Sequence, residues 1–310
     1  MQTLILGAGA IGGYYVSHLA RAGMKVSFLV RPGRAARLKT QGLTVWSQGV
    51  AQQQQVRTLV AAEVDQPLDL IILTCKAFDL PSAMNAIAPA VGPTSVVLPL
   101  LNGLAHMKVL TDRFGPERVL GGVAYIAAEM QRDGKIRRTS PSDAIIFGDL
   151  SGRMTPSVQA LAAAFATTPV AARTSTEIVQ DLWEKWCMLA AGAAVTCLMR
   201  GTIGEILATD NGAAVVASLI AETRAIAAGF DHPPRPVAVE QADRILRDPK
   251  SRWAASMMRD IAQGAPRLEA EHVIGDMIGR GRQVGVAAPL LAAAYAHLQL
   301  YNGRAAERAA

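Results

Sequence analysis

A glycine-rich run near the start of the chain constrains the fold more than any other feature. An apolar stretch over residues 2–6 leads into Gly7-Ala8-Gly9-Ala10-Ile11-Gly12, and a helical pattern over 11–22 follows. A G-x-G-x-x-G motif between a strand and a helix is typical of a dinucleotide-binding βαβ unit. Its first glycine allows the tight turn, its second lets the backbone approach a pyrophosphate, and its third lets the helix pack against the strand.

Free backbone N–H groups at the start of this helix are expected to face the anion. The residues predicted to hold the dinucleotide phosphates are therefore Gly7, Gly9, Ala10, Ile11 and Gly12.

Length and composition favour an α/β protein with two domains. The chain has 310 residues, 51% of them hydrophobic and only 5% aromatic, which argues against disorder. The longest apolar run, residues 186–199, is shorter than the roughly 20 residues of a membrane span, so no membrane partner is expected.

The formal net charge of +6 is concentrated in the first half of the chain, with the glycine-rich run. An anionic nucleotide accounts for this charge, and no motif for nucleic-acid binding accompanies it. Cys75, Cys187 and Cys197 form no C-x-x-C or zinc spacing, so we expect no metal site, reduced thiols and a cytoplasmic protein.

The two halves of the chain differ in pattern. Residues 1–174 alternate β and α signals, which predicts a Rossmann-like NADP-binding domain with a mostly parallel sheet covered on both faces. Residues 175–310 show only helical patterns, which predicts an all-α substrate and dimerisation domain with Gly229 as a helix C-cap.

These patterns give the following expected elements. Strands are expected over 4–6, 25–30, 43–46, 55–59, 70–74, 95–98, 119–128, 134–139 and 144–147. Helices are expected over 11–22, 79–88, 177–199, 213–228, 237–247, 252–263, 268–280 and 290–300.

Arg31 indicates which dinucleotide is bound. It follows the second strand about 20 residues after the glycines, where an NAD-binding domain usually places an acidic residue on the ribose 2′-hydroxyl. A cation there suits a 2′-phosphate, so we expect NADPH. For Arg34, Arg37 and Lys39 a solvated basic loop is the better interpretation.

Two further polar residues follow expected strands. Ligands of open α/β sheets sit beyond the carboxyl ends of the strands. Lys76 follows the strand over 70–74, so we place it at the cofactor. Asn102 follows the strand over 95–98, where it either binds substrate or the nicotinamide ribose or is part of an ordinary Asn-Gly turn.

Lys185 lies at the edge of the long apolar helix over 177–199. Such a lysine is commonly solvated or snorkelling. Alternatively, partial burial lowers its pKa toward neutrality and lets it donate a proton to a carbonyl oxygen. Helical periodicity does not choose between these interpretations.

Taken together, these motifs make the chain resemble the ketopantoate reductase (2-dehydropantoate 2-reductase) family over nearly its whole length. The matching pieces, in order, are Gly7-x-Gly9-x-x-Gly12, Arg31, Cys75-Lys76-Ala77-Phe78-Asp79, Asn102-Gly103, Leu182-Trp183-Glu184-Lys185, Ala255-Ser256-Met257-x-x-Asp260, and Glu269 followed by Gly275.

The resemblance implies an NADPH-dependent reduction of a 2-keto acid to a 2-hydroxy acid, as in pantothenate biosynthesis. It implies that Lys185 is the general acid that protonates the developing alkoxide. It also implies that Asn102, Ser256 and Glu269 position the substrate or Lys185.

The chain departs from the family pattern at three positions. Leu189, Ala193 and Ile274 stand where the family usually has asparagine, which predicts a less polar pocket wall. Two alternatives therefore stay open: a related dehydrogenase acting on a different, more apolar 2-keto acid, and a non-catalytic NADP-binding protein. The apolar helical half also offers a surface for a homodimer.

Overall fold

The computed structural model describes residues 1–140 and 143–308. The chain divides into two compact units, which are described separately. Unit 1 contains Met1–Leu101 and His106–Asp181, and unit 2 contains Asn102–Ala105 and the chain from Leu182 onward. Unit 2 therefore includes a short segment that follows the last strand of the sheet in unit 1.

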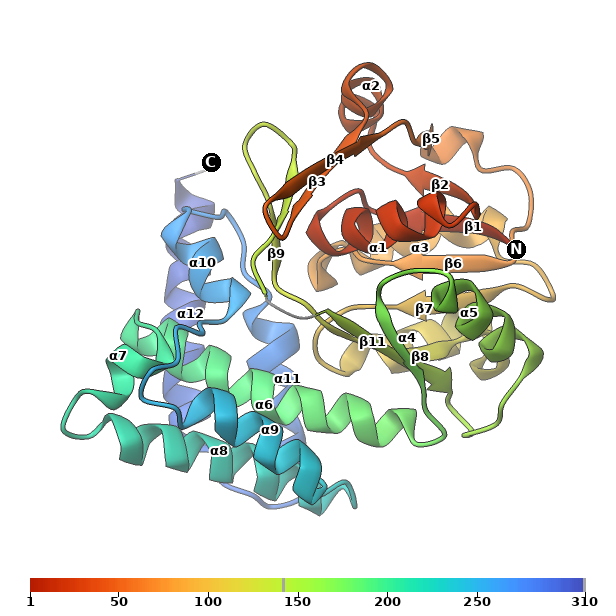
Figure 1. Ribbon diagram of the computed structural model, residues 1–310. Coiled ribbons are helices and arrows are strands. Elements are labelled where there is room, and N and C mark those ends of the chain that lie inside the picture. The colour runs from red at the N-terminus through yellow and green to blue at the C-terminus, as the bar shows by residue number, and fades with distance from the viewer. Residues whose placement is uncertain (141–142, 309–310) are drawn as a thin grey trace. The chain divides into compact units, whose positions relative to one another are not determined.

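A five-stranded parallel sheet forms the centre of unit 1 (Figure 1). Its order is β5-β2-β1-β6-β7, and the strand order reverses between β1 and β6. Right-handed crossovers on the two sides of this reversal place helices on opposite faces, as the alternating pattern predicts. The strands are β1 (Gln2–Leu6), β2 (Lys25–Leu29), β5 (Arg57–Leu59), β6 (Leu70–Leu73) and β7 (Val96–Pro99).

Seven other strands form two smaller sheets rather than extending the parallel one. One has the order β4-β3-β10-β9 and the other β12-β11-β8, and both contain antiparallel pairs. The expectation of a mostly parallel sheet is thus confirmed for the centre of unit 1 only. These strands are β3 (Leu43–Ser47), β4 (Val50–Gln54), β8 (Leu120–Tyr125), β9 (Ala128–Met130), β10 (Ile136–Arg138), β11 (Ala144–Asp149) and β12 (Ala171–Thr174).

The helices of unit 1 include several that the sequence patterns did not predict. The expected helix is α1 (Ala10–Arg21), and the region over 79–88 forms α3 (Leu80–Ile87) after a 3₁₀ turn. The unpredicted helices are α2 (Pro32–Gln41), α4 (Ala105–Phe114) and α5 (Pro156–Ala166). Helix α2 buries little besides Leu38, so it lacks the apolar stripe on which helix prediction depends.

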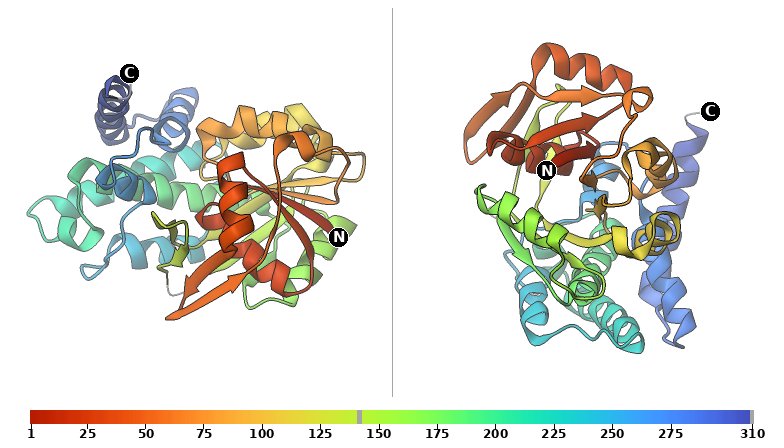
Figure 2. Two further views of the ribbon diagram at one scale, coloured as in Figure 1. Left: turned by 90° about the horizontal axis from the view of Figure 1, so that it is seen from above. Right: turned by 90° about the vertical axis from the view of Figure 1, so that its right-hand side faces the viewer.

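The regular elements of unit 2 among the described residues are all helices, and the last described strand, β12, precedes α6 in the chain. These elements are α6 (Ile178–Met199), α7 (Ile203–Leu207), α8 (Gly212–Gly229), α9 (Pro236–Leu246), α10 (Ser256–Ala262), a π-helix η5 (Glu271–Gly275), α11 (Asp276–Gln283) and α12 (Pro289–Glu307). Figure 2 shows these helices from two further directions.

Three expectations about unit 2 are wrong in detail. Helix α10 begins at Ser256 rather than 252, because the backbone of residues 251–255 bonds to other elements: Ser251 and Trp253 accept from the start of α7, and the Ala255 N–H donates to Thr196. Gly229 is the last residue of α8, and Phe230 caps the helix. The helix expected over 268–280 contains the wide π turn of η5.

By length and composition, helix α8 is long and apolar enough to cross a membrane, with a mean hydropathy of 1.3. Among the described residues no other helix meets this criterion. Core helices of globular proteins pass the same test. Helix α8 buries Val216, Leu219 and Ile220 and packs against α7, α11 and α12, as a core helix does.

Candidate active site

The glycine-rich run of unit 1 forms the turn that the motif predicts. Gly7 has a φ of +103°, which disfavours any other residue. A Cβ on Gly12 would lie 2.2 Å from the Gly7 carbonyl oxygen and 2.4 Å from Thr74 Oγ1, so α1 approaches the sheet closely only because residue 12 is glycine. Thr74 Oγ1 donates to the carbonyls of Leu6 and Gly7 and fixes the turn to β6.

The start of α1 is open to an anion. Gly9 is the N-cap, with no side-chain hydrogen bond to the first turn and no acidic residue in that turn. A Cβ on Gly9 would meet nothing within 4 Å. The space beside Gly9 is thus open at the positive end of a 12-residue helix. This geometry fits the pyrophosphate of a dinucleotide.

Arg31 lies where the second strand ends. It is the N-cap of α2, its side chain is 85% exposed, and it pairs with Asp79 at 3.5 Å. An ion pair of that length and exposure stabilises the fold little. Arg31 is therefore an exposed cation beside the carboxyl edge of the sheet.

Arg34 differs from the solvated loop residue that the sequence suggested. It lies on α2, where it is half-buried and donates to the carbonyls of Ala8 and Gly134, at 3.2 and 3.0 Å. Arg34 therefore joins the glycine-rich turn to the β9–β10 hairpin. Arg37 and Lys39 are also on α2, and both are exposed.

Lys76 follows β6 and begins the 3₁₀ turn that precedes α3. It is partly exposed at the same edge of the sheet as the glycine-rich turn and Arg31. This common edge follows from the parallel order of β2, β1 and β6, as expected.

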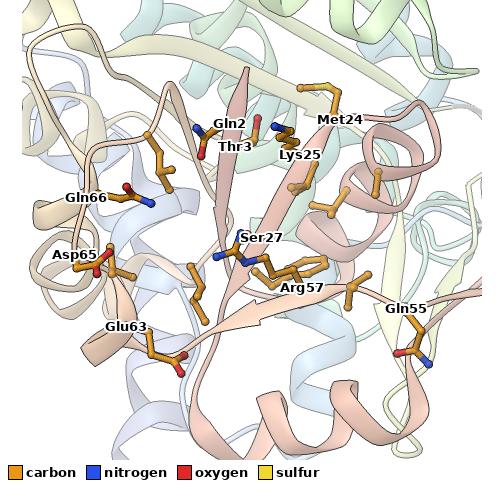
Figure 3. A pocket seen from close by; sticks show the side chains of 18 residues that line it. Gln2, Thr3, Met24, Lys25, Ser27, Gln55, Arg57, Glu63, Asp65 and Gln66 are labelled. Carbon is orange, nitrogen blue, oxygen red and sulfur yellow. The ribbon is translucent and has the colours of Figure 1, made fainter.

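A cavity of about 350 Å³ lies in unit 1 away from these residues. Figure 3 shows Gln2, Thr3, Lys25 and Arg57 around it. Gln2 and Lys25 begin their strands, so this cavity is at the amino edge of the sheet, opposite the glycine-rich turn. It is not the predicted site.

Unit 2 brings together three of the predicted site residues. The Lys185 ammonium on α6 donates to Asn102 Oδ1 at 3.3 Å, and the Glu269 carboxylate acts on Lys185 through its charge. Asn102 precedes Gly103, whose φ of +79° makes the segment a turn. The Asn-Gly turn and the functional interpretation of Asn102 are therefore compatible.

The environment of Lys185 perturbs its ionisation. Burial lowers the pKa of the Lys185 ammonium to about 8, and the negative charge of Glu269 opposes that shift. The lysine is thus neither a freely solvated nor a snorkelling side chain. A lysine with a pKa near neutrality is suited to proton transfer.

The residues on either side of Lys185 fix the helix. Glu184 accepts from the Arg235 guanidinium at 2.7 Å. The Trp186 indole donates to the Val273 carbonyl at 2.9 Å inside the core. These bonds on flanking residues determine which way α6 faces, and therefore the direction of Lys185.

Ser256 lies farther from Lys185 than the other predicted residues. It begins α10, and the preceding residue, Ala255, donates to Thr196. Thr196 is three turns along α6 from Lys185, about 16 Å at 1.5 Å per residue. Ser256 thus lies toward the far end of the α6 face that carries Lys185.

The three positions without asparagine differ in their exposure. Ala193 and Ile274 are 1% and 0% exposed, so both are core residues, and only Leu189 is partly exposed. Trp253 adds an aromatic surface that the sequence did not indicate. A Cβ on Gly192 would lie 2.5 Å from its indole, which therefore packs directly on α6.

His272 is a second residue that the sequence patterns missed. Its imidazole contacts Gly103 and hydrogen-bonds to the backbone of Asn102. Burial lowers the pKa of His272, while Glu269 and other carboxylates oppose the shift. A histidine three residues after Glu269 is the only signal the sequence gave, and it is too weak to assign a role.

Unit 1 has a βαβ unit whose helix start is open to an anion, and unit 2 is a helical unit with a partly buried lysine. This combination is typical of two-domain, dinucleotide-dependent oxidoreductases. The family model "Ketopantoate reductase PanE/ApbA" matches residues 3–152, and "Ketopantoate reductase PanE/ApbA C terminal" matches residues 177–302. The chain belongs to the ketopantoate reductase family and is an oxidoreductase acting on a keto or CH–OH group.

Individual relatives agree with this assignment. The chain is 34% identical to the "Uncharacterized oxidoreductase YkpB" of Bacillus subtilis, over 97% of this chain and 99% of that protein. The solved 2-dehydropantoate 2-reductase of Geobacter metallireducens is 28% identical, with a TM-score of 0.88 over 97% of this chain and 99% of the other.

A D-mandelate dehydrogenase solved with NADH and anilino(oxo)acetate shares the fold, at 22% identity and a TM-score of 0.89 over 98% and 99% of the two chains. The family match indicates a nicotinamide dinucleotide as the cofactor.

Proposed function

We propose that this protein reduces a 2-keto acid to the 2-hydroxy acid with NADPH. The observation that carries the proposal is the Lys185 ammonium, which Asn102 Oδ1 holds at 3.3 Å and whose pKa burial lowers to about 8. A keto reduction places negative charge on the carbonyl oxygen, and a fixed ammonium stabilises that charge and donates the proton.

Each polar residue near Lys185 has a defined part in this proposal. Asn102 accepts from the ammonium and restricts its direction, which keeps one N–H available for the carbonyl oxygen. The Glu269 carboxylate keeps the lysine protonated despite burial. For Ser256, at the start of α10, a substrate contact is proposed on the family resemblance alone.

We propose that Gly7, Gly9, Ala10, Ile11 and Gly12 hold the cofactor pyrophosphate, with Lys76 and Asn102 nearer its nicotinamide end. The bound nicotinamide supplies the hydride. Arg31 selects NADPH, because an 85% exposed guanidinium with one weak partner is available to a 2′-phosphate.

We propose a substrate more apolar than ketopantoate. Leu189 is the partly exposed residue one turn after Lys185, and Trp253 covers α6 one turn beyond it. Hydrophobic surface in place of amide groups lowers the preference for a hydroxylated substrate. Ketopantoate itself is the second candidate, since the family match favours it.

NADPH oxidation with a panel of keto acids tests the proposal. We expect faster turnover of 2-ketoisocaproate and phenylglyoxylate than of ketopantoate. Replacement of Lys185 by Ala should lower kcat by roughly 10²–10⁴-fold without weakening NADPH binding. Tight NADPH binding without turnover of any keto acid would refute the reductase proposal and favour a non-catalytic NADP-binding protein.

We also propose a cytoplasmic homodimer formed through the helical unit. Light scattering of the purified protein at several concentrations tests the oligomeric state.

A further inference from the structure

His272 lies in the one π-helical segment of the described chain, η5 (Glu271–Gly275). A π turn inserts one extra residue into a helix and commonly marks a functional site. Here it follows Glu269, whose carbonyl accepts from the Val273 N–H at 3.1 Å. The segment thus connects a predicted site residue to α11.

The imidazole and backbone of His272 pack closely on the Asn102–Gly103 turn. A Cβ on Gly103 would lie 2.7 Å from the His272 carbonyl oxygen, 2.9 Å from Cδ2 and 3.1 Å from Nε2. The ring edge that carries Nε2 therefore faces the turn. The ring also hydrogen-bonds to the Asn102 backbone.

The other face of this segment is fixed as well. Val273, the next residue, accepts from the Trp186 indole at 2.9 Å. Trp186 directly follows Lys185 on α6, so the same segment contacts both the lysine's helix and the turn that carries Asn102. Asn102 Oδ1 in turn accepts from the Lys185 ammonium.

From this arrangement we propose that His272 is a positioning residue: its ring holds the Asn102–Gly103 turn so that Asn102 Oδ1 directs the Lys185 ammonium. The kinetic consequence rests on the proposed reductase function, whereas the effect on Lys185 itself does not. His272 acts through Asn102 and needs no contact with the substrate.

Two conservative variants separate the ring's hydrogen bond from its bulk. Glutamine carries an amide nitrogen near the place of Nε2, and asparagine carries one near the place of Nδ1. Because the Nε2 edge faces the turn, His272→Gln should retain function and His272→Asn should not. Gly103→Ala should reproduce the defect, since its Cβ would displace the turn.

Steady-state kinetics give the first test. His272→Ala should lower kcat about 100-fold with little change in KM or NADPH affinity, because small misplacement of a catalytic group costs that much. With 4-deuterated NADPH, the isotope effect on kcat should rise as the chemical step becomes rate-limiting. A loss of folded protein alone would leave the isotope effect unchanged, and that result would overturn the proposal.

A second test does not require turnover. Reductive ¹³C-methylation of the full protein gives an NMR signal for Lys185, identified by its absence in Lys185→Arg. Its titration midpoint should shift in His272→Ala toward that of an exposed lysine and stay near the wild-type value in His272→Gln.

The two tests separate the two proposals. Wild-type protein that reduces no keto acid would refute the reductase function, while the titration still decides the role of His272. An unchanged midpoint in His272→Ala, in folded protein, would overturn the positioning role.

Discussion

Lys185 shows how burial of a single ionisable residue opposes stability. Its pKa is lowered from the ordinary value of 10.5 to about 8, mainly by burial. The folded protein therefore binds the lysine's proton more weakly than the unfolded chain does. Below about pH 8 the charged lysine destabilises the folded protein by its full amount. Stability is regained as the pH rises from about 8 to 10.5.

Replacement of Lys185 by Met should therefore stabilise the protein at pH 7 and abolish reduction. Methionine keeps most of the volume and removes the buried charge. We expect a Tm several degrees above wild type, with the difference shrinking above pH 8. Lys108→Met is the matched control, because Lys108 is 81% exposed, and its Tm should not change. A lower Tm for Lys185→Met at pH 7 would contradict this account.

The pH dependence of turnover tests the same group kinetically. A general acid works in its protonated form, so kcat for keto acid reduction should be level below about pH 8 and fall tenfold per pH unit above it. Lys185→Arg should be slower and lose this limb, because arginine stays protonated. A limb that persists in Lys185→Arg would assign the titration to another group.

Arg31 is the residue proposed to distinguish two nearly identical cofactors. Arg31→Ala should weaken NADPH binding about tenfold or more and leave NADH binding nearly unchanged, because only NADPH carries a 2′-phosphate. Fluorescence titration with both cofactors measures this. Lys39→Ala, an exposed cation in the last turn of α2, serves as the control. Equal losses for both cofactors in Arg31→Ala would reject the contact.

At the scale of elements, two glycines of one turn have separable tasks. A Cβ on Gly9 meets nothing within 4 Å, whereas one on Gly12 would lie 2.2 Å from the Gly7 carbonyl oxygen. Gly9→Ala should thus keep the wild-type Tm but lose most NADPH affinity, because the methyl group occupies the pyrophosphate's approach. Gly12→Ala should lower both.

Thermal unfolding with and without NADPH distinguishes these outcomes. Gly303→Ala, in an exposed turn of α12, controls for the general effect of removing a helical glycine, and its Tm should rise slightly. If Gly9→Ala bound NADPH as tightly as wild type, the pyrophosphate would not approach this face of the turn.

Elements with strong local signals were predictable from the sequence. The strands at Leu70–Leu73 and Val96–Pro99 are buried along their whole length, so each is a continuous apolar run. Helix α2 and strand β12 expose most of their residues, so neither shows a hydrophobic period. The start of α10 was misplaced because residues 251–255 are ordered by Thr196, far away in sequence.

At the scale of the whole molecule, cofactor binding should stabilise the fold. A ligand that binds only the native state at about 100 times its Kd adds roughly 2.7 kcal/mol at 25 °C. We expect NADPH to raise the unfolding midpoint of wild-type protein in calorimetry. Gly9→Ala at the same concentration should show little increase, and an equal increase would contradict a site at the glycine-rich turn.

The sequence by itself determined the class of fold and led to the predictions of the dinucleotide and the lysine, because each depends on local order. A glycine motif between a strand and a helix, and a cation after the second strand, need no distant partner to be recognised. Only the tertiary structure decided which residues meet Lys185. Asn102 and Glu269 come from segments far apart in the chain, and His272, three residues after Glu269, packs on the Asn102–Gly103 turn.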